Sequence, residues 1–362
     1  MTMRVLHLNT EKTWRGGERQ TLLTALEQRR QGLDAHIACR RGSPLETAAR
    51  KENIPTISLP VFAPALLGKL AVVCGTFDLL HCHTGRVHSL VALANLFNSK
   101  PLVVSRRVIF AQKKNWFNRF KYHRVAKVVC VSRFVADQMR SWGLPAERVV
   151  VIHDAVAEEN FLSREKCLEQ LCKNIGDIRG KRLVGNIAAL GPDKDHATLL
   201  RAARLVADRR ADVAFVVIGD GELREDLLQL RSELKLDSTV HFTGFVPQAQ
   251  ELLPAFDVFA MSSCMEGLGS IVLDAGLAGV PVAATAGGGL PEIVVHEQTG
   301  LLVPVGDAEK LAAAILRLLD DSALAIKLVA AAQNKIRTEF SLARMAQSYA
   351  EIYREIISKP PN

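Results

Sequence analysis

The stretch at 258–292 constrains the fold more than any other part of the chain, because it reads as strand, loop, helix, strand and loop without interruption. Apolar, β-prone residues at 258–261 open it, and an alanine- and leucine-rich helical run ends at Gly279. A second apolar run at 281–284 leads into three consecutive glycines. Two strands joined by a helix in this way predict a parallel sheet, in which ligands bind at the carboxyl ends of the strands.

The loop inside this stretch has the features of a phosphate site. Its glycines allow a ligand to approach the backbone closely. The free N–H groups of Leu268, Gly269 and Ser270 open the helix, and the positive end of a helix dipole attracts phosphate. Carboxylates at Glu266 and Asp274 stand on either side and can accept hydrogen bonds from sugar hydroxyls. A phosphate seat between two hydroxyl acceptors predicts a nucleotide-sugar site.

These residues resemble the donor-site signature of glycosyltransferase family 4, the retaining enzymes of GT-B fold in which seven residues separate two glutamates. Glu266 fills the first glutamate position, and Asp274 stands at the second, which keeps the charge but shortens the reach. The resemblance continues through GGLPEIVVHEQTGLLVP at 288–304, another segment typical of the family.

The resemblance implies roles for further residues. Lys194 matches the lysine that neutralises the leaving diphosphate, but Ala189 replaces the arginine usually found five residues before it; Arg107 or Arg19 could substitute. The predicted catalytic residues are Lys194 and Glu266. The predicted donor-binding residues are Gly16, Gly17, Gly219, Gly244, Val246, Leu268, Gly269, Ser270, Asp274, Gly288, Gly289 and Glu292. No metal and no cofactor is expected, and UDP or GDP is the expected nucleotide.

Strand and helix patterns alternate along the whole chain, which predicts an α/β fold with parallel sheets. With the resemblance, we expect the GT-B architecture: two Rossmann-like, doubly wound domains that face each other across a cleft. The first domain would be residues 1–157, with a final helix at 341–358 packing back on it, and the second 158–340. Ser132 and Asp195 read as helix N-caps.

Charge is unevenly distributed between the two predicted domains. The chain has a net charge of +8, but residues 1–157 carry 24 Lys/Arg against 10 Asp/Glu, whereas 158–362 carry 22 against 28. A basic first domain predicts an anionic partner. Anionic lipid headgroups and a phosphorylated glycan both fit; nucleic acid is not expected.

Nothing in the sequence indicates export or insertion into a membrane. No apolar run reaches the roughly 20 residues that span a bilayer, and the N-terminus lacks the pattern of a signal peptide. The seven cysteines are scattered, which suits a reducing compartment. We therefore expect a cytoplasmic protein that contacts the inner face of the membrane peripherally.

Three residues at strand ends of the first domain are candidates for acceptor binding: His83, Arg106 and Arg107. The pair His81 and His83 also suggests a metal, but no further ligand stands at metal-like spacing. The alternative role of His83 is a hydrogen bond to the backbone. The alternative role of Arg106 and Arg107 is a surface salt bridge. Many relatives carry a sugar-contacting histidine near 106; since this chain has arginines there, that role is not transferred.

Residues 110–124 interleave aromatic and basic side chains. If helical, this segment would suit a membrane-surface helix, and an amphipathic helix packed on the sheet is the alternative.

The resemblance implies retaining transfer of a sugar from a nucleoside diphosphate to a glycan or lipid-linked acceptor, as in lipopolysaccharide or cell-surface polysaccharide synthesis. Two alternatives remain open. One is a nucleotide-sugar epimerase of the same fold. The other is an inactive, membrane-associated binding protein, which the changes at Ala189 and Asp274 would permit.

Overall fold

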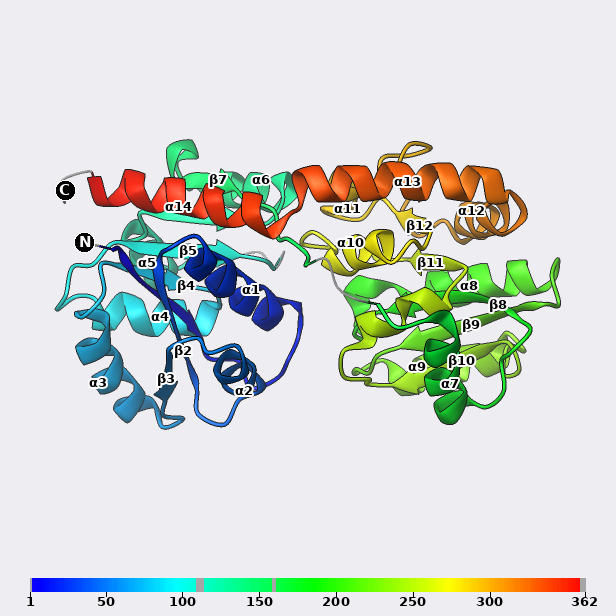
Figure 1. Ribbon diagram of the computed structural model, residues 1–362, viewed down its shortest axis with the longest axis horizontal. Coiled ribbons are helices and arrows are strands. Elements are labelled where there is room, and N and C mark those ends of the chain that lie inside the picture. Colours follow the sequence, from blue (N-terminus) through cyan, green and yellow to red (C-terminus); the bar gives the residue numbers. More distant parts are fainter. Residues whose placement is uncertain (1, 109–113, 158–160, 359–362) are drawn as a thin grey trace. The chain divides into compact units, whose positions relative to one another are not determined.

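The computed structural model describes residues 2–108, 114–157 and 161–358, and the chain forms two compact units (Figure 1). Unit 1 joins Met1–Ala157 to Phe340–Asn362, and unit 2 is Glu158–Glu339. Each unit is built around its own sheet, and all the strand pairs described are parallel.

Unit 1 holds a seven-stranded sheet in the order β3-β2-β1-β4-β5-β6-β7. Its strands are β1 (Arg4–Asn9), β2 (Asp34–Arg40), β3 (Thr56–Leu59), β4 (Leu79–Cys82), β5 (Leu102–Arg106), β6 (Lys127–Cys130) and β7 (Val149–Val151). Its α-helices are α1 (Gly16–Arg30), α2 (Pro44–Lys51), α3 (Ala63–Cys74), α4 (Gly85–Ala94), α5 (Trp116–His123), α6 (Arg133–Trp142) and α14 (Leu342–Ser358).

Short polar side chains start several helices of unit 1. The Ser132 hydroxyl accepts a hydrogen bond from the Val135 N–H at 3.1 Å, so the predicted N-cap of α6 is confirmed. Thr84 and Asn115 cap α4 and α5 in the same way. α6 ends at Gly143, whose φ of 117° lies in the left-handed region that favours glycine.

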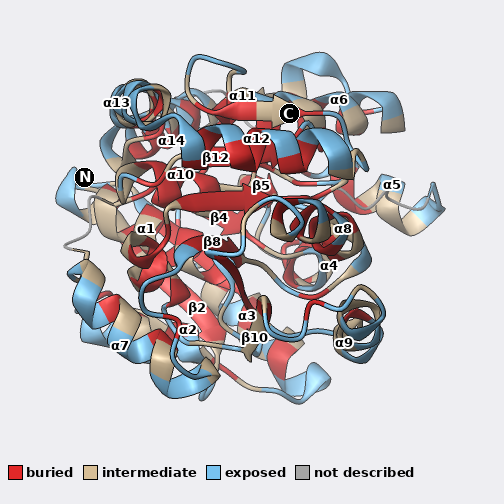
Figure 2. Ribbon diagram, turned by 90° about the vertical axis from the view of Figure 1, so that its right-hand side faces the viewer, coloured by how far each residue is buried: buried red, intermediate tan, exposed pale blue. Residues whose placement is uncertain are grey.

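The last helix, α14, belongs to the core of unit 1. Tyr349 and Tyr353 are completely buried and pack with Val5, Leu79 and Val103 of the sheet. Buried aromatic side chains of this size contribute strongly to core stability. Unit 1 therefore needs both ends of the chain for its core, and Figure 2 shows the sheet strands largely in the colour of buried residues.

Unit 2 holds a six-stranded sheet in the order β10-β9-β8-β11-β12-β13. Its strands are β8 (Arg182–Ile187), β9 (Val213–Ile218), β10 (Val240–Gly244), β11 (Val258–Met261), β12 (Val282–Thr285) and β13 (Leu301–Val303). Its α-helices are α7 (Arg164–Ile175), α8 (His196–Ala207), α9 (Arg224–Glu233), α10 (Ser270–Leu277), α11 (Leu290–Ile293), α12 (Ala308–Asp320) and α13 (Ser322–Glu339).

The core of unit 2 is made of apolar strand residues and of the helices that cover them. Phe215 of β9 is 1% exposed and belongs to the same cluster as Leu200 of α8 and Ile315 of α12. Asp195 caps α8 through a hydrogen bond from the Thr198 N–H at 3.2 Å, which confirms the second predicted cap.

Both sheets confirm the prediction of two parallel, Rossmann-like folds. The strand order changes direction between β1 and β4 in unit 1 and between β8 and β11 in unit 2. Ligands of such sheets bind at the carboxyl ends of the strands beside this point. None of the helices within the described ranges has the length and apolarity needed to cross a membrane.

Candidate functional site

A buried ion pair stands at the switch point of unit 2. Lys194 ends the short 3-10 helix after β8, and its ammonium lies 2.6 Å from Glu266 Oε1 and 3.1 Å from Asp193 Oδ2. The side chains of Lys194 and Glu266 are 18% and 9% exposed. Burial alone would lower the pKa of Lys194, but the two carboxylates raise it above its usual value. The two predicted catalytic residues therefore touch, and Lys194 stays charged.

The backbone around Glu266 is fixed by neighbouring loops. The Ser263 hydroxyl donates to Glu266 Oε1 at 3.0 Å, and the Gly289 N–H donates to the Glu266 carbonyl at 2.9 Å. Gly288 has a φ of 61°, and a Cβ there would lie 2.1 Å from that carbonyl oxygen. Only glycine fits such a contact, so Gly288 and Gly289 lock the loop that carries Glu266.

The helix after this loop presents its N-terminus at the same strand end. α10 begins at Ser270 behind Gly269, which has a φ of 88° and whose added Cβ would meet Leu290 at 2.6 Å. Leu268 and Asp274 are 3% and 2% exposed. Glu292, on α11, is half-buried. The predicted phosphate seat is thus a helix N-terminus that follows directly on Glu266.

A second pair of loops in unit 2 carries the predicted donor-binding residues Gly219, Gly244 and Val246. A Cβ on Gly219, which has a φ of 148°, would lie 1.8 Å from the Ala188 carbonyl oxygen. The Gly219 N–H donates to the Gly244 carbonyl at 3.0 Å. Val246 is half-buried, and Phe245 before it is 63% exposed. These glycines hold the ends of β8, β9 and β10 close together.

Gly16 and Gly17 open helix α1 in unit 1. Glu18 in the same turn is 4% exposed and accepts hydrogen bonds from the Arg15 N–H at 3.0 Å and the Asn9 amide at 3.2 Å. Burial raises the pKa of Glu18. An added Cβ on Gly17 would have open space around it.

His83 and Arg107 lie together at the switch point of unit 1. Arg107 Nε donates to both carboxylate oxygens of Asp154, at 2.9 and 3.1 Å, and its Nη1 donates to His83 Nδ1 at 2.9 Å. The side chains of Arg107 and Asp154 are 10% and 9% exposed. The positive charge of Arg107 is therefore neutralised inside the unit, which weakens its case as a substitute for the missing phosphate-binding arginine.

A chain of hydrogen bonds continues from His83 into the core. Its Nε2 lies 2.9 Å from His7 Nδ1, and His7 Nε2 lies 2.8 Å from Gln28 Oε1. Burial lowers the pKa of His83 well below its usual value and that of His7 to about 4, so both rings are neutral at pH 7. A guanidinium only donates. His83 therefore accepts at Nδ1 and donates from Nε2, and His7 does the same.

His81 completes a group of three histidines with ligand atoms within 4.8 Å of one another. Tyr353 OH lies 2.6 Å from His81 Nδ1, and His81 Nε2 lies 2.8 Å from Ser105 Oγ. A metal needs free lone pairs on these rings, and those of His7 and His83 are already used. In the described structure the three rings form a hydrogen-bonded core.

Arg106 points away from this group, because consecutive residues of a strand face opposite sides of a sheet. It is 6% exposed and hydrogen-bonds Tyr122 of α5. Residues 110–113 of the predicted membrane-surface segment lie outside the described part of the chain. Within α5, Trp116 is 78% exposed, whereas Lys121 is 6% exposed.

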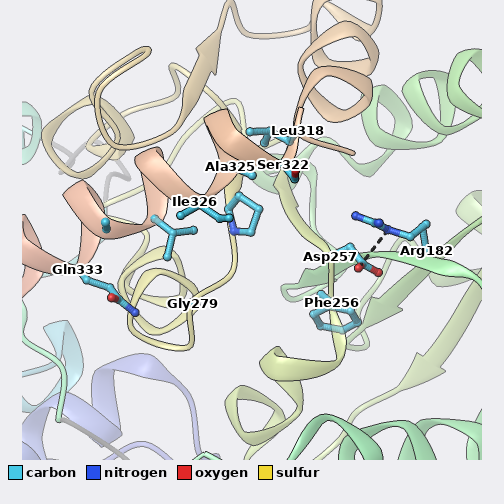
Figure 3. A pocket seen from close by; sticks show the side chains of 12 residues that line it. Arg182, Phe256, Asp257, Gly279, Leu318, Ser322, Ala325, Ile326 and Gln333 are labelled. Carbon is cyan, nitrogen blue, oxygen red and sulfur yellow. Dashed lines mark ion pairs between the residues drawn. The ribbon is translucent and has the colours of Figure 1, made fainter. Parts of the chain in front are cut away.

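The groove drawn in Figure 3 lies elsewhere in unit 2. It has a volume of about 440 Å³ and is lined by Arg182 at the start of β8, Asp257 before β11, and Ile326 of α13. These strand starts are the opposite edge of the sheet from Lys194. The groove is therefore separate from the predicted donor site.

Sequence reasoning missed Asp154, His7 and Gln28. Spacing along one segment cannot reveal a histidine on the neighbouring strand, although His7 and His81 are paired in the register of β1 and β4. The only sign of the role of His7 in the sequence was the apolar pattern around it, which predicts a buried strand.

Known proteins match both units. Residues 14–160 match the family model described as Glycosyltransferase Family 4, and residues 171–335 match the one described as Glycosyl transferases group 1. The lipopolysaccharide core biosynthesis glycosyltransferase LpsD of Rhizobium meliloti (strain 1021) is 36% identical over 238 residues, which cover 66% of each chain. The amylovoran biosynthesis glycosyltransferase AmsK of Erwinia amylovora is 28% identical over 70% of this chain and 62% of its own length. The chain thus spans just under two thirds of the length of these relatives.

A solved structure matches over nearly the whole chain. The crystal structure of Anabaena HepE in complex with UDP and glucose aligns with a TM-score of 0.85 at 22% identity, over 96% of this chain and 98% of that one. This likeness confirms the predicted fold class.

Proposed function

Because the chain belongs to the family 4 and group 1 glycosyltransferases of GT-B fold, we propose that it transfers a sugar from a nucleoside diphosphate sugar to a hydroxyl of a glycan or lipid-linked acceptor. The observation that carries the proposal is the contact of Lys194 with Glu266, 2.6 Å apart, next to the N-terminus of α10. A cation and a helix N-terminus suit a diphosphate, and a carboxylate beside them suits a sugar hydroxyl.

Each group then has a defined task in the reaction. Lys194 and the N–H groups at 268–270 would stabilise the negative charge that develops on the departing diphosphate. Glu266 would orient the donor sugar, and buried Asp274 would hold the ribose hydroxyls. We propose retention of the anomeric configuration and independence of metal, with UDP or GDP as the leaving group. The HepE complex with UDP and glucose supports this donor class for a protein of the same fold.

We further propose an anionic acceptor, such as a lipopolysaccharide core, and a peripheral site at the cytoplasmic face of the inner membrane. The basic charge of residues 1–157 and the name of the relative LpsD support this proposal. Exposed aromatic side chains of unit 1, Trp116 at 78% and Phe97 at 85%, suit contact with lipid headgroups.

Binding and turnover can be tested in sequence. Thermal shifts and calorimetry with UDP, GDP, ADP, dTDP and CMP, in EDTA, should single out one diphosphate, and Lys194→Ala should remove that binding. Lys310→Ala is the matched control, since Lys310 is 64% exposed and pairs only with Asp307 in the described structure. Absence of binding by every nucleotide would refute the proposal.

The reaction itself is tested with the sugar of the preferred nucleotide. We expect the nucleoside diphosphate to be released slowly from its α-linked sugar, and faster when lipopolysaccharide core is added. Proton NMR should show an α-linked product. Interconversion of the sugar without an acceptor would instead identify an epimerase.

A further inference from the structure

Arg224 is a partly buried cation without a partner in the described structure. It is the first residue of α9, and its guanidinium makes no hydrogen bond or ion pair with any residue in the described ranges. Its Nη1 is shielded from water. Removing a charged donor from water without a partner is costly. A site of this kind is completed when a ligand supplies the acceptor.

The position of Arg224 identifies which part of a nucleotide it can meet. An added Cβ on Gly244 would lie 3.8 Å from Arg224 Nη1, so the guanidinium lies at the carboxyl end of β10. Lys194 follows β8, and β9 separates β8 from β10. Two strand spacings amount to about 10 Å. A nucleoside diphosphate with its phosphates at Lys194 covers that distance with its ribose and base.

We propose that Arg224 donates hydrogen bonds to an oxo group of the nucleobase and thereby selects uracil or guanine over adenine. This inference rests on the proposed function, because it assumes that Lys194 holds the diphosphate. A guanidinium donates hydrogen bonds and accepts none. Uracil O4 and guanine O6 are acceptors, whereas adenine carries an amino group at the corresponding position.

Nearby residues support a base rather than a phosphate. Phe245 follows Gly244 and is 63% exposed, so its ring can stack on a planar base. Gly219 and Gly244 both have positive φ angles and are joined by a hydrogen bond, which leaves bare backbone at this strand end.

The test compares nucleotides across variants of the full chain. Calorimetry would measure the dissociation constants of UDP, GDP, ADP and inorganic pyrophosphate for the wild type, Arg224→Met and Arg224→Lys. We expect Arg224→Met to weaken the preferred nucleotide about 10-fold or more, and ADP and pyrophosphate less than about 3-fold. Arg224→Lys, which keeps the charge but not the fork of donors, should also lose the preference between bases.

Arg231→Met is the matched control on the same helix. Its guanidinium pairs with Asp237 at 3.0 Å and donates to the Val240 carbonyl, so its loss should leave base preference unchanged. Equal weakening of all four ligands would show a phosphate contact and overturn the inference, as would unchanged binding. Failure of the wild type to bind any nucleotide would instead refute the proposed function.

Discussion

Replacing Glu266 by glutamine should strengthen the binding of a free nucleoside diphosphate while it greatly slows sugar transfer. The Glu266 carboxylate lies 2.6 Å from the ammonium of Lys194, and both side chains are largely buried. A diphosphate must compete with that carboxylate for the same N–H groups. Glutamine keeps the shape but removes the charge, so the competition weakens.

The size of the effect follows from the contacts. Hydrogen bonds to charged groups contribute about 1.5–3 kcal/mol. Asp193 still lies 3.1 Å from the ammonium in the variant, so we expect the lower end of that range. A gain of about 1.4 kcal/mol is a 10-fold lower dissociation constant. Turnover should fall, because the proposed orientation of the donor sugar by the Glu266 carboxylate would be lost.

Two assays measure these effects. Calorimetry gives the dissociation constant of the preferred nucleoside diphosphate, and a coupled assay of its release from the sugar donor gives the turnover. Asp193→Asn is the control: its carboxylate is more exposed, at 33%, so binding should tighten by less and turnover should persist. If Glu266→Gln bound the diphosphate no better than the wild type, the carboxylate would not compete for Lys194 and the reasoning would fail.

Three further predictions concern stability and backbone strain. The folded pKa of His7, about 4, lies below the unfolded value of 6.5, so stability is full above pH 6.5 and is lost as pH falls towards 4. Between pH 6.5 and 5 the loss from His7 is about 2 kcal/mol, and His7→Phe should remove that share of the pH dependence of urea-denaturation stability, while the share of His83 remains. Arg107→Met should cost about 3–5 kcal/mol by leaving buried Asp154 unpaired, whereas adding Asp154→Leu should restore most of it in the same denaturation assay. Gly288→Ala should abolish turnover through its clash with the loop backbone, and Gly17→Ala, which has open space, should leave the melting temperature unchanged.

The sequence predicted the fold well because its signals are local. Strand and helix periods, the caps at Ser132 and Asp195, and glycine stops each depend on a few consecutive residues. The final helix, expected at 341–358, is α14 and begins one residue later, at Leu342. Boundaries of this kind depend on packing, which a local pattern does not contain.

The candidate site was less accessible to such reasoning. The family resemblance marked Glu266 and Lys194 in two separate motifs, but their contact joins positions 72 apart in the chain. Arg107 was interpreted as an acceptor-binding residue and as a substitute for the arginine absent at Ala189, because it follows the end of a strand. Asp154, which neutralises it, follows a strand two places further across the sheet.

Ala189 stands where the family usually has an arginine, so other groups have to balance the negative charge of a diphosphate. The contacts show in part which groups these are. Arg107 is already neutralised by Asp154, and Arg224 lies at the strand end that suits the base. Lys194 itself has two carboxylates beside it, those of Asp193 and Glu266. Under the proposed function, the diphosphate would then be held largely by Lys194, once Glu266 is displaced, and by the N–H groups that open α10. Because Lys194 is largely buried and backbone N–H groups carry no net charge, the dissociation constant of the donor, measured by calorimetry, should depend only weakly on salt concentration.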